Sequence, residues 1–290
     1  AGKSTTLACI IDRLNHERSG HIITMEDPIE YVHKHGTCIV TQREVPTDVA
    51  TYSEALRSAM RESPDVILLG EMRDQDTIGT AVTAAEMAQL LFSTLHTTGA
   101  AGTVDRIIDA FPASQQRQIR IQLSMVLQAI VSQQLVPTVD GGTAPAFEIM
   151  ITNTAIRNLI REEKTHQLDS AIASGGAEGM RTMDQSLFDL VKSGRVAKEM
   201  ALQYSIHQEA LENRRPVEPH RASTSNDNAP QLVTSCGAFS CLDETPGETL
   251  GTGLVSHTRS TRDGISVPLS HSLCLIFDYA CFRASATLRA

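Results

Sequence analysis

The first residues of the chain form a pattern that could bind phosphate. Gly2, Lys3 and Ser4 match the last three positions of G-x-x-x-x-G-K-[ST]. In that motif backbone N–H groups surround the phosphates, the lysine reaches the β and γ oxygens, and the hydroxyl holds Mg²⁺. A G-K-S triplet alone often arises by chance. It gains weight when a helix follows it, because the N-terminus of that helix must face the phosphates.

The residues after the triplet have the period of an amphipathic helix. Apolar side chains recur at i, i+3, i+4 and i+7, the spacing of one helical face: Leu7, Ile10, Ile11 and Leu14. We therefore predict a helix over residues 4–18. The predicted helix thus begins where the phosphate-binding motif requires one.

Polar residues follow three apolar runs that we predict to be strands. The run 21–25 leads into Glu26-Asp27-Pro28-Ile29-Glu30, the run 66–70 into Glu71, and the run 90–95 into His96. Ligands bind at the carboxyl ends of parallel strands, so we expect these ends to lie on the same side of the sheet as Lys3. Acidic groups at two ends suit Mg²⁺ and an attacking water, and a histidine at the third can sense the γ-phosphate.

Each of these signals also has a structural explanation. Asp27-Pro28 is a common turn, Glu71 could be a solvated strand end, and His96 could be a structural histidine. These explanations would have to coincide, in this order, behind a helix that follows a phosphate-binding motif. Their joint occurrence therefore favours a nucleotide site.

Strand-like runs and amphipathic helices alternate up to residue 215, which is typical of an α/β core with a parallel sheet. We predict no strand after residue 151. The expected strands are 21–25, 38–42, 66–70, 90–95 and 146–151; the expected helices are 4–18, 52–62, 76–87, 101–109, 114–134, 154–163, 166–173, 183–192 and 197–204. The predicted organisation is a core over 1–151, a small all-helical domain over 152–212 and a tail over 213–290.

The tail differs in composition from the rest of the chain. It is rich in Ser and Thr, begins with Pro216, Pro219 and Pro230, and has no helical period. We predict that it is irregular, either disordered or unrelated to the domain before it.

The bulk composition is that of an ordinary globular protein. A formal net charge of −9 argues against nucleic acid as a partner, because that requires a basic surface. No segment reaches the roughly 18 apolar residues that span a bilayer, so we predict no direct membrane insertion. The six cysteines contain no C-x-x-C pair. We predict reduced, structural thiols in a cytoplasmic protein rather than a zinc site.

Together the motifs resemble the secretion and type IV pilus motor ATPases, hexameric enzymes with a RecA-like P-loop NTPase core. The similarity covers about residues 1–212. The Walker A motif, Asp box, atypical Walker B motif and His box of that family correspond, in order, to Gly2–Thr5, Glu26–Glu30, Gly70-Glu71 and the stretch around His96. The resemblance implies ATP hydrolysis, with ATP and Mg²⁺ as cofactors.

An eight-residue motif points to the retraction branch of this family. The AIRNLIRE motif of that branch matches Ala155, Ile156, Arg157, Asn158, Leu159, Ile160, Arg161 and Glu162. On a helix the apolar members form one stripe and the two arginines lie together on another face. A surface helix with solvated arginines would explain the same pattern. The resemblance implies instead an element that couples hydrolysis to retraction, and the tetracysteine zinc insert usual in assembly motors is absent from this sequence.

The resemblance assigns roles to the site residues. Glu30 would polarise the attacking water and Glu71 would act through the metal shell, two roles that could be exchanged. His96 would contact or sense the γ-phosphate. Nucleotide binding would fall to Gly2, Lys3, Ser4 and Thr5, and Mg²⁺ binding to Ser4 and Glu71.

Three arginines are candidate fingers that complete a neighbouring subunit's site: Arg43, Arg57 and Arg61. The last two are four residues apart on one predicted helix, so they could act together; each could equally form a surface ion pair. Action between subunits would require the homo-hexamer of the family. The family also implies a platform protein of the inner-membrane pilus machinery as the partner, and a cytoplasmic location at that membrane.

Several alternatives stay open at this stage. The chain could be a pilus-assembly or type II secretion ATPase of the same superfamily. It could also be a non-catalytic, N-terminally truncated copy, because the first half of the P-loop, the strand that leads into it and the N-terminal domain of the family do not precede Gly2. A nucleic-acid translocase is disfavoured by the charge.

Overall fold

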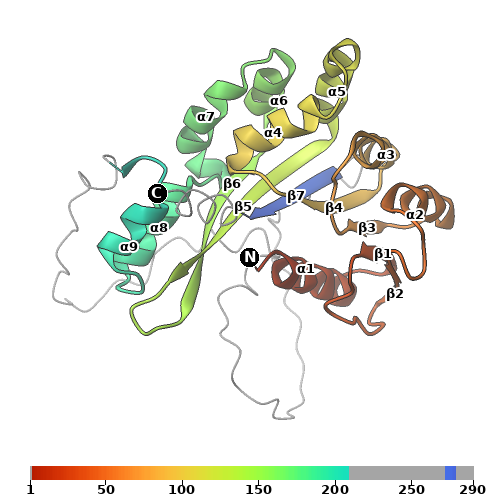
Figure 1. The fold of residues 1–290 in the computed structure, drawn as a ribbon, viewed down its shortest axis with the longest axis horizontal. Coiled ribbons are helices and arrows are strands. Elements are labelled where there is room, and N and C mark those ends of the chain that lie inside the picture. Colours follow the sequence, from red (N-terminus) through yellow and green to blue (C-terminus); the bar gives the residue numbers. More distant parts are fainter. Residues whose placement is uncertain (1, 209–271, 279–290) are drawn as a thin grey trace, which may run out of the picture.

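The computed structural model describes residues 2–208 and 272–278, which form a mixed sheet between layers of helices (Figure 1). The strands lie in the order β2-β1-β3-β4-β7-β5-β6. All neighbours run parallel except β5 and β6, which form an antiparallel hairpin. The strands are β1 (Gly20–Glu26), β2 (Cys38–Glu44), β3 (Val66–Leu69), β4 (Leu90–Leu95), β5 (Leu127–Pro137), β6 (Thr143–Ile151) and β7 (Ser272–Asp278).

Strands β3 and β4 are buried on both faces. On β3, Val66 and Leu68 pack into one apolar cluster, whereas Ile67 and Leu69 pack into the other. Uninterrupted apolar strands of this kind are typical of a parallel sheet that helices cover on both sides. This is why short apolar runs marked these strands in the sequence.

Different helices cover the two faces of the sheet. On one face, α1 (Lys3–Glu17) buries Leu7, Ile10 and Ile11 against the strands. Figure 1 shows α4 and α5 on the side away from α1. The helices that pack on this second face are α2 (Tyr52–Ala59), α3 (Gln75–Glu86), α4 (Gly99–Asp109) and α5 (Ala113–Val126).

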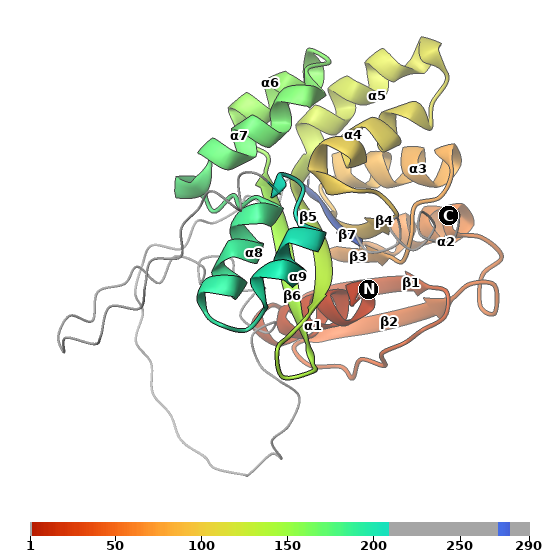
Figure 2. The ribbon, with the colours of Figure 1, turned by 60° about the vertical axis from the view of Figure 1, so that its left-hand side comes forward.

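The helices after β6 divide into two pairs, which Figure 2 separates clearly. The first pair joins the main core beside α4 and α5, through residues such as Ile156 and Leu168. The second pair packs on the β5–β6 hairpin, where Val136 and Ala146 meet Met183 in a cluster of their own. The pairs are α6 (Thr154–Arg161) with α7 (Leu168–Ser174), and α8 (Met183–Lys192) with α9 (Lys198–Tyr204); short 3-10 turns are Met60–Glu62, Thr165–Gln167 and Gly176–Glu178.

Two segments that were predicted to be helical or irregular form strands. The predicted helix 114–134 ends at Val126, and its second half is strand β5. Residues after 151 were predicted to contain no strand, yet 272–278 of the predicted irregular tail form β7 within the sheet. The remaining residues of the predicted tail lie outside the described part of the chain.

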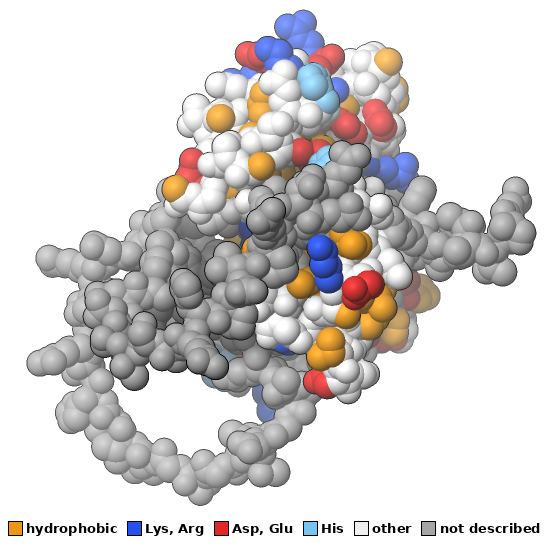
Figure 3. All heavy atoms as spheres, turned by 90° about the vertical axis from the view of Figure 1, so that its left-hand side faces the viewer, with side chains coloured by type: hydrophobic (Ala, Val, Ile, Leu, Met, Phe, Trp, Pro, Cys, Tyr) orange, Lys and Arg blue, Asp and Glu red, His pale blue; other side chains and the backbone are white. Residues whose placement is uncertain are grey.

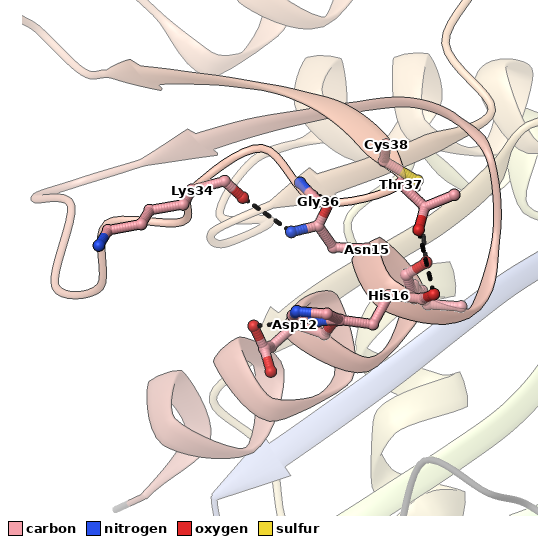
Figure 4. A network of polar contacts seen from close by, with 8 residues as sticks. Asp12, Asn15, His16, Lys34, Gly36, Thr37 and Cys38 are labelled. Atoms are coloured by element: carbon pink, nitrogen blue, oxygen red, sulfur yellow. Dashed lines mark hydrogen bonds and ion pairs between the residues drawn. The ribbon is translucent and has the colours of Figure 1, made fainter. Parts of the chain in front are cut away.

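A polar network fixes the loop between β1 and β2 against the last turns of α1 (Figure 4). Asn15 is almost fully buried; its amide donates to Lys34 O at 2.8 Å and its Oδ1 accepts from Gly36 N–H at 3.0 Å. Thr37 N–H donates to Asn15 O at 2.8 Å and its hydroxyl donates to His16 O at 3.2 Å. The loop therefore has a fixed far end, which matters because its near end carries Glu30.

The surface offers two general observations. Among the described residues, no helix has the length and apolarity needed to cross a bilayer. On the coloured part of the face in Figure 3, basic and acidic side chains are interspersed.

Candidate nucleotide site

Helix α1 begins at a glycine that no other residue could replace without strain. Gly2 has φ 87°, in the left-handed region, and its carbonyl accepts the first helical hydrogen bond from Thr6 N–H at 3.0 Å. A Cβ on Gly2 would lie 2.8 Å from Gln133 Nε2 on β5. Conformation and space both require glycine. The first N–H groups of a helix have no partner within it, which makes this terminus an anion site.

Gln133 on β5 contacts the first turn of α1. No motif in the sequence indicated this residue. The Thr6 hydroxyl donates to Gln133 Oε1 at 2.8 Å, in a buried contact. The side chain of Gln133 is only 3% exposed. The start of α1 is therefore tied to β5 as well as to the strands named by the motifs.

The loop after β1 closes onto the first turn of α1. The Ser4 hydroxyl donates to Glu30 Oε1 at 2.7 Å. The hydroxyls of Thr5 and Tyr31 lie 2.9 Å apart and share a hydrogen bond. The structure thus brings Ser4 and Glu30 together as the sequence predicted, and it adds Tyr31, which the sequence did not single out.

The ends of β3 and β4 meet Lys3 in a row of charged groups. Lys3 Nζ lies 3.4 Å from each ring nitrogen of His96. His96 Nε2 lies 3.3 Å from Glu71 Oε1, and Arg73 Nε donates to Glu71 Oε2 at 2.8 Å. A change of charge at one member alters the field at its neighbours. Lys3, Glu71 and His96 were predicted to converge, and they do; Arg73 was missed.

A cavity of about 180 Å³ lies between the start of α1 and these strand ends. Its wall includes Lys3, Ser4, Glu30 and Glu71. Tyr52 of α2 also lines it. Burial, with help from the nearby Asp27 carboxylate, raises the pKa of Tyr52 to about 12, so this phenol stays protonated and can donate a hydrogen bond into the cavity. Nothing in the sequence pattern indicated Tyr52.

The donor atoms suit a hard cation such as Mg²⁺. Ser4 and Glu30 offer a hydroxyl and a carboxylate oxygen next to each other. The described residues contain no group of three or more His, Cys, Asp or Glu poised around a metal. Mg²⁺ commonly uses one or two protein oxygens together with phosphate and water. Glu71, predicted at the metal, contacts Arg73 and His96; its role in binding Mg²⁺ stays a prediction.

Comparison with known families matches residues 1–219 to the type II/IV secretion system proteins. The chain belongs to this family. It is 54% identical over 201 residues to the type IV pilus retractation ATPase PilT of Pseudomonas aeruginosa, covering 69% of this chain and 58% of that protein. A twitching motility protein of Neisseria gonorrhoeae is 51% identical over 212 residues, covering 73% and 57%. The chain thus spans less than two thirds of these relatives.

Solved structures agree with the assignment to the family. A crystal structure of the pilus retraction motor PilT with bound ADP superposes with a TM-score of 0.68 and 51% identity, over 73% of this chain and 60% of that one. The Legionella pneumophila ATPase DotB superposes with a TM-score of 0.65 and 27% identity, over 70% and 56%.

The three candidate arginine fingers have different surroundings in this family member. Arg43 on β2 is held by Glu62, through contacts of 2.7 and 2.8 Å to the two carboxylate oxygens. Arg57 and Arg61 are exposed. They do not share a helix as predicted, because α2 ends at Ala59 and Arg61 lies in the following 3-10 turn. A role between subunits stays a prediction for all three.

The motif helix α6 is not a freely solvated surface helix. Ile156 and Ile160 are fully buried in the main core. The Arg157 guanidinium donates to the carbonyls of Ser124 and Met125 at 2.8 and 2.7 Å, in the last turn of α5. A cation placed there satisfies carbonyls that the helix leaves unpaired. Arg157 therefore joins α6 to α5.

We predict that Arg157→Ala lowers the free energy of unfolding by about 1–3 kcal/mol, because two carbonyls in the last turn of α5 lose a charged donor. Arg161→Ala removes the same charge from an exposed position and should change stability by less than about 0.5 kcal/mol. Urea unfolding of both variants measures the difference. Equal losses would show that Arg157 does not cap α5.

Proposed function

We propose that this protein is an ATP-hydrolysing motor that powers retraction of type IV pili. The observation that carries the proposal is the convergence of Lys3, Ser4, Glu30 and Glu71 on one cavity at the start of α1. The relatives named above support retraction rather than assembly of the pilus, since they include a pilus retractation ATPase and a twitching motility protein.

In this proposal the chain binds and orients ATP through α1. Lys3 contacts the β and γ phosphates, and Ser4 with Glu30 holds Mg²⁺, which supplies charge neutralisation when it is bound. Glu30, which accepts from the Ser4 hydroxyl, is also the proposed group that polarises the attacking water. Loss of the γ-phosphate changes the charge next to Lys3, and the contacts from Lys3 to His96 and from His96 to Glu71 transmit this change. Phosphoryl transfer depends mainly on such positioning and electrostatics.

The working assembly proposed here is a homo-hexamer at the cytoplasmic side of the inner membrane. Exposed Arg57 and Arg61 then face a neighbouring subunit's nucleotide, so a monomer has little activity. The force is delivered to the platform protein of the pilus machinery. Helix α6, which contacts α5 and α7, is the proposed element that couples ATP hydrolysis to retraction.

A pilus-assembly or type II secretion motor is the alternative within the family. Type II secretion system protein E of Pseudomonas aeruginosa is 42% identical, but over only 110 residues. Cells that lack the protein distinguish the two functions. Loss of a retraction motor leaves cells hyperpiliated, whereas loss of an assembly motor leaves them without pili.

We expect saturating ATP with Mg²⁺ to raise the melting temperature of the protein by about 5 °C or more, because ligand at 100 times its dissociation constant stabilises the native state by about 2.7 kcal/mol. Lys3→Ala should abolish most of the shift. Lys192→Ala, which removes a lysine from α8, is the matched control and should keep it. The absence of any shift at millimolar ATP would favour a non-catalytic fragment.

A further inference from the structure

The sheet contains a position that only one segment of the described chain fills. Strand β4 pairs with β3 on one side and with β7 on the other, and β5 pairs with β6 and β7. Among the described strands, β4 and β5 are joined only through β7. Without β7 the sheet would be two separate pieces, each with an unpaired backbone edge in the interior. Buried backbone groups without partners are strongly disfavoured, so this position requires an occupant.

The position lies at the nucleotide site. β7 runs parallel to both neighbours, and its carboxyl end is level with Leu95 and Gln133. Gln133 contacts the first turn of α1, as described above. Both α1 and α3 pack on β7, from opposite faces of the sheet. In a P-loop, a strand in such a place leads through the phosphate loop into the helix. Here the chain leaves β7 toward residue 279, not toward Gly2.

The segment has the sequence such a position needs. Residues 273–277 are Leu-Cys-Leu-Ile-Phe, an unbroken apolar run between Ser272 and Asp278. Runs of this kind are typical of strands buried on both faces of a parallel sheet. Parallel pairing on both sides also fixes the direction of any segment that enters.

We propose that the position between β4 and β5 is a strand-accepting slot and that residues 272–278 of the same chain are its resident occupant. The slot takes one extended apolar segment, parallel to its neighbours, with its carboxyl end at the start of α1. Since a slot holds one strand at a time, residues 272–278 and any other strand compete for it. The segment thereby completes the wall of the nucleotide site without connecting to the phosphate-binding helix.

Hydrogen exchange followed by mass spectrometry tests the occupancy in the full chain. We expect amides of residues 273–277 to exchange at least about 100-fold more slowly than in the free peptide. Leu275→Pro removes a ladder N–H and should speed exchange in β4 and β5 but not in β2. Leu254→Pro, a leucine outside β7, is the matched control. Fast exchange of 273–277 in the unaltered chain would overturn the proposal, even if the proline variant failed to fold.

A cysteine pair tests the register and the source of the strand. The Cα partner of Cys274 on β5 is Ala129, so Ala129→Cys should form a disulfide with Cys274 under mild oxidation. Ile130→Cys, whose partner is Leu275, should not. Peptide mapping should find the bond within one chain. A bond between two chains would overturn the assignment to the same chain, and equal reaction of both variants would overturn the slot. Neither result depends on ATP turnover.

Discussion

Replacing Glu30 or Glu71 by glutamine is expected to lower the rate of ATP hydrolysis by about 10²–10⁴-fold while leaving nucleotide binding in place. Glutamine keeps the size of the side chain but removes its charge and its capacity to accept a proton. Glu30 would lose its proposed action on the attacking water, and Glu71 would lose its ion pair with Arg73 and its charged contact to His96. Phosphate release at saturating ATP measures both variants.

The Glu30→Gln and Glu71→Gln variants also distinguish direct action on the attacking water from action through the metal. A residue that acts directly on the water should reduce turnover at every Mg²⁺ concentration, whereas a residue that acts through the metal should be partly rescued by more Mg²⁺. Glu26→Gln is the matched control, because Glu26 lines the same cavity but its carboxylate is occupied by Thr24 and Gln42. Undiminished turnover in both Glu30→Gln and Glu71→Gln would refute the assigned site.

The second large effect is expected at Glu148, a buried carboxyl that links the nucleotide site to the C-terminal helices. Glu148 lies on β6 and is 4% exposed. Its Oε1 accepts from Ala100 N–H at 2.8 Å, at the start of α4, just after the His96 loop. It also accepts a backbone hydrogen bond from Met183, at the start of α8. One side chain thus holds the first turns of two helices.

Glu148 should make stability depend on pH. Burial, reinforced by the charge of Asp169, raises its pKa from 4.5 to about 7, against the opposing effect of the Ala100 hydrogen bond. The folded state therefore binds the proton more tightly than the unfolded state. Its contribution is complete below about pH 4.5 and is lost as the pH rises through about 7, which amounts to about 3 kcal/mol.

Urea unfolding at several pH values between 5 and 8 measures this contribution. The unaltered protein should lose stability across the range, relative to Glu148→Gln, which cannot titrate. Glu178→Gln removes an exposed carboxyl and is the matched control; it should keep the original profile. Parallel profiles for Glu148→Gln and the unaltered protein would show that Glu148 is ionised in the folded state throughout.

The part of the site that follows strand ends could be predicted from sequence because its signals are local. Strands β1, β3 and β4 are short runs rich in apolar residues, and Glu30, Glu71 and His96 follow close behind their ends. Parallel pairing then places Glu71 and His96 on one edge, with the loop that carries Glu30. Apolar runs, together with the rule that ligands bind at the carboxyl ends of parallel strands, were enough to predict this part of the site.

The parts that were mispredicted depend on distant pairing. The segment 114–134 has enough helical character to extend a helix, but Leu127 onward becomes strand because β6 and β7 offer hydrogen bonds on both sides. Gln133 and Tyr52 carry no motif, and only the packing of β5 and α2 places them at the cavity. The apolar run at 273–277 is a local pattern typical of a strand, but its place between β4 and β5 is set by partners far away in sequence.

The late place of β7 in the chain has a consequence for folding during synthesis. The ribosome completes β6 at Ile151, long before it makes Ser272. Throughout that interval β4 and β5 are both sheet edges, and exposed edges of apolar strands recruit foreign strands. Pairing across so long a stretch of chain is also intrinsically slow. The nascent protein is therefore most vulnerable to aggregation in the window before β7 emerges, and a chaperone that shields that edge would raise its yield.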